Sequence, residues 1–166
     1  SNIVYCDKPF MASPLSREAA RDAIKMLAIM WGGLEELKKM TVTASLITPL
    51  SPFRYTTEMA GSMIELARHN QACILGALLM AGSSGPTNLA GMLAQQNAEI
   101  LAGVALIQLA NPGAPVIVGG TPTILDMRTG GLAMGSPEVV RLTSATIQLA
   151  KFYNLPARAG CSNTDA

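Results

Sequence analysis

The chain has 166 residues, the length of one ordinary domain, and its 49% apolar content is sufficient for a continuous hydrophobic core. A net charge of +1 argues against nucleic acid or an anionic membrane as a partner, and the longest apolar run, residues 72–82, is too short to cross a bilayer. Only 14% of the residues are charged, about half the usual share, which predicts that part of the surface is covered by another subunit of a homo-oligomer or by the rest of a longer chain.

Short apolar stretches and helical patterns alternate along the chain. In order, we expect a strand at 3–7, helices at 16–33 and 34–40, a strand at 41–48, a helix at 57–70, a strand at 72–81, a helix at 88–113, a strand at 114–120, a helix at 136–154 and a strand at 155–160. Ser16, Thr57, Asn88 and Ser136 are typical residues at a helix N-terminus, and Pro137 suits the first turn of the last helix. Strands that recur every 30 to 40 residues indicate repeated βα units.

The expected strands are continuously apolar rather than alternating, which predicts a parallel sheet buried on both faces. A doubly wound sheet and a segment of a (β/α)8 barrel both fit, but the chain has neither a GxGxxG nor a GxxxxGK[ST] motif. A complete barrel needs about 250 residues, so five strands and four crossover helices amount to roughly half of one. We therefore expect an α/β fold in which residues 1–166 form a partial (β/α)8 (TIM) barrel domain and belong to a longer chain.

Polar loops follow the expected strands, at the edge where such sheets place their active sites. These loops are Asp7, residues 48–55, the GSSG segment at 82–85, GGTPTILDMRTGG at 119–131 and residues 162–165. Asp126 and Arg128 either face a site or brace their own loop against each other. Gly82–Gly85 either cradles a phosphate at a helix N-terminus or forms a turn that requires small residues.

Four polar residues interrupt the otherwise apolar helix expected at 88–113: Gln95, Gln96, Asn97 and Glu99. They either form a solvated outer face or make buried polar contacts with a neighbouring element. The only histidine, His69, is expected at a helix C-terminus, which argues against a histidine triad and against a metal site. Three widely spaced cysteines without a CxxC pair, and no signal-like N-terminus, indicate a reduced, cytoplasmic protein.

Four segments together resemble the trimethylamine methyltransferase (MttB) superfamily. They are SLITPLSPFRYTTEM at 45–59, LAQQNAEILAGVALIQLANPGAPVIVGGTPTILDMRTGG at 93–131, GSPEVV at 135–140 and LAKFYNLPARAGCSNTDA at 149–166. The resemblance implies a (β/α)8 barrel in a substantially longer protein. It also implies transfer of a methyl group from a tertiary or quaternary methylated amine, such as trimethylamine or a betaine, to the cobalt of a corrinoid. A separate corrinoid protein carries that cofactor, so none is expected to bind this segment directly. The archaeal trimethylamine member uses pyrrolysine, whereas many other members lack it.

A cationic amine favours carboxylates and aromatic faces in a dry pocket. From their places at strand ends, we expect Asp126, Arg128 and Asp165 to act in catalysis. The expected substrate-binding residues are Ser51, Phe53, Tyr55, Ser84, Gln95 and Glu99. Two other functions remain open from the residues: a barrel enzyme of another class that binds a phosphate-bearing ligand at the GSSG segment, and a folded but non-catalytic fragment.

Overall fold

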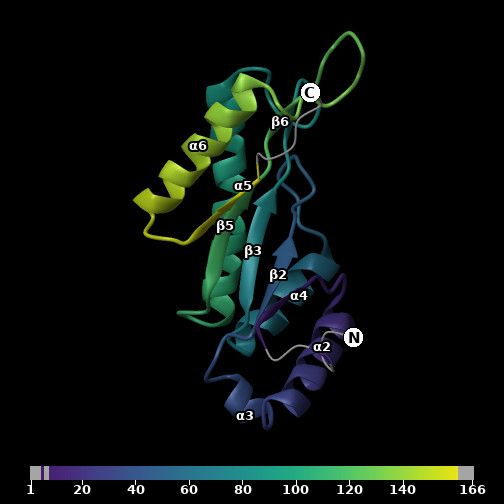
Figure 1. Ribbon diagram of the computed structural model, residues 1–166, viewed down its shortest axis with the longest axis vertical. Coiled ribbons are helices and arrows are strands. Elements are labelled where there is room, and N and C mark those ends of the chain that lie inside the picture. The colour runs from purple at the N-terminus through teal and green to yellow at the C-terminus, as the bar shows by residue number, and fades with distance from the viewer. Residues whose placement is uncertain (1–4, 6–7, 161–166) are drawn as a thin grey trace. The chain divides into compact units, whose positions relative to one another are not determined.

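The computed structural model describes Tyr5 and residues 8–160 (Figure 1). The elements in chain order are β1 (Phe10–Ala12), α2 (Arg17–Met30), α3 (Leu34–Leu37), β2 (Thr43–Ile47), α4 (Thr57–Arg68), β3 (Ala72–Ala77), β4 (Met80–Ala81), α5 (Leu89–Ala110), β5 (Val116–Gly120), β6 (Thr123–Ile124), α6 (Pro137–Phe152) and β7 (Ala157–Ala159). From α2 onward, the predicted alternation of strands and helices is confirmed, whereas β1, β4 and β6 were not expected as separate strands.

Among the described residues, five strands form one sheet in the order β1-β2-β3-β5-β7. β1 runs parallel to β2 with Phe10 opposite Thr43, and β5 runs parallel to β7 with Val118 opposite Ala157. β4 and β6 form a second, two-stranded parallel sheet. The fold is therefore mixed α/β with a parallel sheet and crossover helices, as the apolar strands predict.

The element boundaries correct two details of the prediction. The strand expected at 72–81 is two strands, β3 and β4. The side chain that caps α4 is Thr56 rather than Thr57, because Thr56 Oγ1 accepts the N–H of Met59 (3.2 Å). The strand expected at 3–7 lies outside the described residues except for Tyr5, which is helical and exposed. The caps predicted at Ser16 and Asn88 are confirmed by bonds from backbone N–H groups three residues further on.

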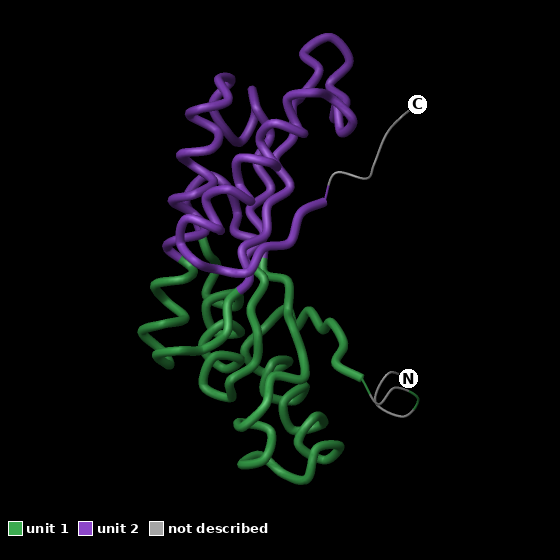
Figure 2. Tube along the Cα trace, turned by 60° about the vertical axis from the view of Figure 1, so that its left-hand side comes forward, with its two compact units in different colours: residues 1–47, 55–74, 103–116 green, residues 48–54, 75–102, 117–166 purple. Residues whose placement is uncertain are grey.

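The chain folds as two compact units (Figure 2). Unit 1 comprises residues 1–47, 55–74 and 103–116, and unit 2 comprises residues 48–54, 75–102 and 117–166. The loops that follow the carboxyl ends of β2, β3 and β5 all belong to unit 2. Most of the sequence-predicted site therefore falls within one compact unit.

Unit 1 is held by an apolar cluster and by two buried polar side chains. The cluster is made of Ile24, Leu27, Ala28, Leu37 and Val42, with Phe10 and Trp31 packed against it. The carboxylate of Glu65 on α4 accepts hydrogen bonds from Arg17 Nε (2.7 Å) and Arg21 Nη2 (3.1 Å) of α2. Burial by itself raises the pKa of Glu65, but these two bonds outweigh it and hold the pKa below its ordinary value.

The second buried polar side chain of unit 1 is the amide of Gln71, which is completely buried. Its Oε1 accepts the backbone N–H groups of Val42 (3.0 Å) and Thr43 (3.2 Å), and its Nε2 donates to the carbonyls of Leu37 (3.2 Å), Met40 (3.0 Å) and His69 (2.8 Å). One side chain thus satisfies backbone groups from the connection before β2 and from the end of α4.

Candidate functional site at the strand ends of unit 2

The loop after β2 is closed on itself by its backbone. Leu50 and Arg54 exchange two hydrogen bonds, from Leu50 N to Arg54 O (2.7 Å) and from Arg54 N to Leu50 O (3.2 Å). Between them, the Ser51–Pro52 peptide bond is cis and Phe53 has a φ of 54°. The Phe53 side chain is 68% exposed, so the loop presents an aromatic ring on the surface of unit 2.

Glu99 of α5 accepts hydrogen bonds from this loop. Its carboxylate is 2% exposed and accepts hydrogen bonds from Ser51 Oγ to Oε2 (2.7 Å) and from the Phe53 N–H to Oε1 (3.0 Å). Gln95, one helical turn earlier, also donates from Nε2 to Oε1 of Glu99 (3.0 Å). The structure therefore brings together four of the predicted substrate-binding residues, Ser51, Phe53, Gln95 and Glu99. For these polar residues of α5, the buried alternative is correct.

The GSSG turn after β4 joins the same network through Ser84, whose carbonyl accepts from Gln95 Nε2 (3.0 Å). Three of its four amide N–H groups donate to the carbonyls of Met80 or Gly85 within the same turn. Ser84 Oγ accepts the N–H of Met80 (3.0 Å), and a Cβ at Gly85 would collide with the sulfur of a buried methionine. A phosphate cradle needs free N–H groups, so the contacts support the turn that requires small residues.

Asp126 and Arg128 lie in an exposed loop after β6. The Asp126 carboxylate accepts the backbone N–H of Arg128 (2.9 Å) and the hydroxyl of Thr129 (2.9 Å), and the Asp126 N–H donates to the carbonyl of Gly131 (2.9 Å). The two donors, the N–H of Arg128 first, hold the pKa of Asp126 below its ordinary value. The carboxylate thus braces its own loop through the backbone of Arg128. A catalytic role for either residue stays a prediction.

Two of the predicted site residues remain, Asp165 and Tyr55. Asp165 lies outside the described residues. Tyr55 belongs to unit 1, where it lines an open groove of about 540 Å³ beside the N-terminus of α4, together with Arg17 and Glu58. Its role in binding an amine therefore also stays a prediction.

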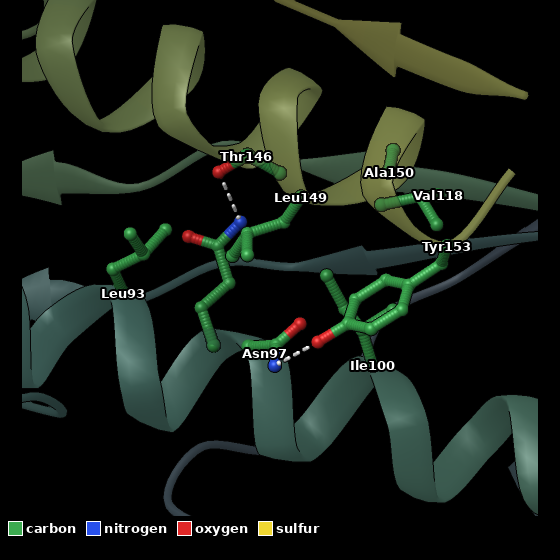
Figure 3. Close-up of a pocket in the computed structure, with 9 residues that line it drawn as sticks. Leu93, Asn97, Ile100, Val118, Thr146, Leu149, Ala150 and Tyr153 are labelled. Carbon is green, nitrogen blue, oxygen red and sulfur yellow. Dashed lines mark hydrogen bonds between the residues drawn. The ribbon is translucent and has the colours of Figure 1, made fainter. Parts of the chain in front are cut away.

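Gln96 and Asn97 of α5 bond to Thr146 of α6 and to Tyr153, which directly follows α6 (Figure 3). Gln96 Nε2 donates to Thr146 Oγ1 (2.9 Å), and Asn97 Nδ2 donates to the hydroxyl of Tyr153 (2.8 Å). The cavity between them measures about 10 Å³, room for roughly one water molecule and too small for a methylated amine. These contacts join the two helices and do not form a substrate site.

Comparison with known proteins identifies the family. The model of the family described as "Trimethylamine methyltransferase (MTTB)" matches residues 1–166. The chain belongs to this family. It is 46% identical over 166 residues to the glycine betaine methyltransferase of Desulfitobacterium hafniense, covering 100% of this chain and 35% of that protein. It is 36% identical over 149 residues to the trimethylamine methyltransferase MttB of Methanosarcina barkeri, covering 90% of this chain and 30% of that protein.

A third family relative is the proline betaine:corrinoid methyltransferase of Eubacterium limosum, 38% identical over 117 residues, which covers 70% of this chain and 24% of that protein. The chain thus spans about a third of the length of the first relatives it matches. The predicted resemblance to the trimethylamine methyltransferases is confirmed, and the relatives are named methyltransferases of both trimethylamine and betaines.

The described residues contain neither a membrane-spanning helix nor a cluster of metal ligands, and their buried cysteine is not reactive. Within Tyr5 and residues 8–160, no helix combines the length and the apolar character needed to cross a bilayer, and no three metal-binding side chains gather. Burial raises the pKa of the Cys73 thiol to about 12, so this thiol is protonated at neutral pH. Cys73 is therefore a packed core residue rather than a nucleophile.

Proposed function

We propose that the full-length protein containing this chain transfers a methyl group from a quaternary amine of the betaine type to the cobalt of a corrinoid on a partner protein. The identity of 46% over the whole chain with a glycine betaine methyltransferase supports this substrate class above trimethylamine, for which the relative is 36% identical. The corrinoid acceptor is supported by the relative whose name includes it, the proline betaine:corrinoid methyltransferase.

We also propose that the sheet is part of a (β/α)8 barrel. Its order, β1-β2-β3-β5-β7, follows the chain without a reversal. A barrel requires each strand to pair with the next along the chain, whereas a doubly wound sheet reverses its order at the point where ligands bind. In a barrel, the loop that carries Ser51 and Phe53 and the loop that carries Asp126 belong to the catalytic face.

The proposed reaction is a displacement at a methyl carbon. The carbon–nitrogen bond breaks with its electron pair remaining on nitrogen, and an electron pair of the reduced cobalt forms the new bond to carbon. The donor changes from a quaternary cation to a neutral tertiary amine, so no proton has to move. The contribution of the protein is alignment of the methyl group between nitrogen and metal, together with exclusion of water.

The proposal is tested with the full-length protein, its corrinoid partner in the reduced state, and glycine betaine, trimethylamine and choline as separate donors. Methylation of cobalt changes the visible spectrum, and we expect it to be fastest with glycine betaine. If only trimethylamine methylates the cobalt, the substrate is trimethylamine and not a betaine. Absence of methylation from every tertiary and quaternary amine would remove the proposed activity.

We further propose a cytoplasmic homo-oligomer. The low charge fraction of 14% supports coverage of part of the surface, and the buried, protonated thiol of Cys73 is compatible with a reducing compartment. Light scattering of the full-length protein measures the number of subunits directly, and a monomer at micromolar concentration would contradict the oligomer.

A further inference from the structure

We propose that Glu99 is a positioning residue: it fixes the loop after β2 so that the Phe53 ring forms a contact surface for the quaternary ammonium group. This inference rests on the proposed methyl transfer and adds the assignment of two roles, aromatic contact for Phe53 and loop support for Glu99.

The hydrogen bonds of Glu99 argue against direct contact between its carboxylate and the substrate. Oε2 accepts from Ser51 Oγ and Oε1 accepts from both the Phe53 N–H and Gln95 Nε2. The side chain is 2% exposed, so a ligand would have to displace the protein's own donors to reach it. Both carboxylate oxygens are therefore engaged in holding the loop and its neighbouring turn.

The backbone at Phe53 requires such support. A φ of 54° lies in the left-handed region, which is uncommon for residues other than glycine, asparagine and aspartate. Strained backbone of this kind persists only where the surroundings hold it, and here the holding contact is the bond from the Phe53 N–H to Glu99 (3.0 Å). The result is an apolar ring that is 68% exposed although an apolar side chain gains by burial.

An aromatic face suits the proposed donor better than a carboxylate does. The quaternary nitrogen is positive in the bound amine and loses its charge as the methyl group leaves. A carboxylate in contact would therefore stabilise the ground state more than the transition state and slow the reaction. The face of a phenyl ring attracts the cation more weakly and also packs against the neutral amine product. This argument assigns amine contact to Phe53 and support of the loop to Glu99.

The test is a double-mutant cycle in the full-length protein with glycine betaine as the ligand. Calorimetry gives the dissociation constant without any methyl transfer. We expect Phe53→Leu to weaken binding about fivefold to thirtyfold, the range of a cation–π contact out of water. Glu99→Gln retains the side-chain volume but places an amide N–H against the donors of the loop. We therefore expect it to weaken betaine binding about as much as Phe53→Leu does. The double variant should bind no more weakly than the weaker single variant, because both changes remove one contact.

A matched control is Glu65→Gln, which neutralises the buried carboxylate of unit 1 (4% exposed) and leaves the loop unaltered. It should lower stability without changing betaine affinity. Hydrogen exchange provides a second readout: in Glu99→Gln, the amide of Phe53 should exchange at least tenfold faster, whereas in Glu65→Gln it should not change.

Several outcomes would overturn the inference. These are an unchanged affinity in Glu99→Gln, full additivity of the two changes, or a loss confined to kcat with normal affinity, which would give Glu99 a part in the reaction itself. Betaine binding with the expected pattern but without cobalt methylation would refute the proposed reaction and leave the positioning role intact. If neither the unmodified protein nor any variant binds betaine, both the proposed reaction and the positioning role are refuted.

Discussion

The replacement Gln71→Met removes the most heavily bonded side chain of unit 1 and nearly preserves its volume. Methionine fills a buried site as glutamine does, so the packing term is small. The two backbone N–H groups that Gln71 satisfies, those of Val42 and Thr43, lose their acceptor in a region closed to water. Each buried unsatisfied donor costs about 1–3 kcal/mol, so the expected loss is roughly 4 kcal/mol of unfolding free energy.

Equilibrium urea unfolding of the full-length protein measures this loss, and hydrogen exchange of the segment 42–47 localises it. The matched control is Gln108→Met, which removes two bonds of the same kind, from the Gly113 N–H (2.8 Å) and to the Ala114 carbonyl (2.9 Å). Because Gly113 is exposed, its N–H regains a bond to water, and only the carbonyl of buried Ala114 loses a donor, so we expect a loss of about 1 kcal/mol. Equal losses in the two variants would refute the argument that burial of the orphaned donors sets the magnitude.

Three further predictions follow from single contacts. Gly120→Ala should destabilise the protein by about 2 kcal/mol in urea unfolding, because the added Cβ meets Nε2 of the buried Gln96; Gln96→Ala should largely relieve the effect, and a neutral Gly120→Ala would contradict it. Glu65→Gln should cost about 1 kcal/mol at pH 7. The folded pKa of Glu65 lies below its ordinary value of 4.5, so its contribution is present above pH 4.5 and is lost as the pH falls through the folded value. The urea midpoints of the two proteins should therefore converge only below pH 4.5. Asp126→Ala should lower kcat/KM several-fold by releasing its loop, and Asp126→Asn should restore most of it, because an amide oxygen still accepts the N–H of Arg128; equal losses in both would point to the charge instead.

From α2 onward, the sequence was sufficient for the order and type of every element except β4 and β6, because residues typical of helix ends mark the start and the end of the helices. Ser16 and Asn88 are caps with local partners three residues away, so the signal is contained in the sequence itself. The division of the segment 72–81 into β3 and β4 has no such local signal, since β4 pairs with β6, about 40 residues further on. Pairing at that distance follows from tertiary structure and not from the residues of the segment.

In the candidate site, too, contacts between residues far apart in the sequence could not be predicted. Ser51, in the loop after a strand, and Glu99, on the helix behind it, were both expected to bind substrate, yet their bond joins positions 48 residues apart and was not predictable. Asp126 and Arg128 were expected either to face a site or to brace their own loop against each other. The observed contact uses the N–H of Arg128, a donor that every residue except proline has, so the identity of the side chain gave no information about it.

The polar residues of α5 divide by the spacing of a helix. Gln95 and Glu99 are one turn apart and therefore share a face, and that face meets the loop after β2 and the GSSG turn. Gln96 and Asn97 bond instead to Thr146 of α6 and to Tyr153 directly after it. α5 is exposed along one side, where Leu109 is 84% exposed, but its buried polar residues Gln95, Gln96 and Glu99 each have a partner within the protein. The face that meets strand-end loops is consequently the one through which α5 acts on the proposed amine site, while the face toward α6 serves stability.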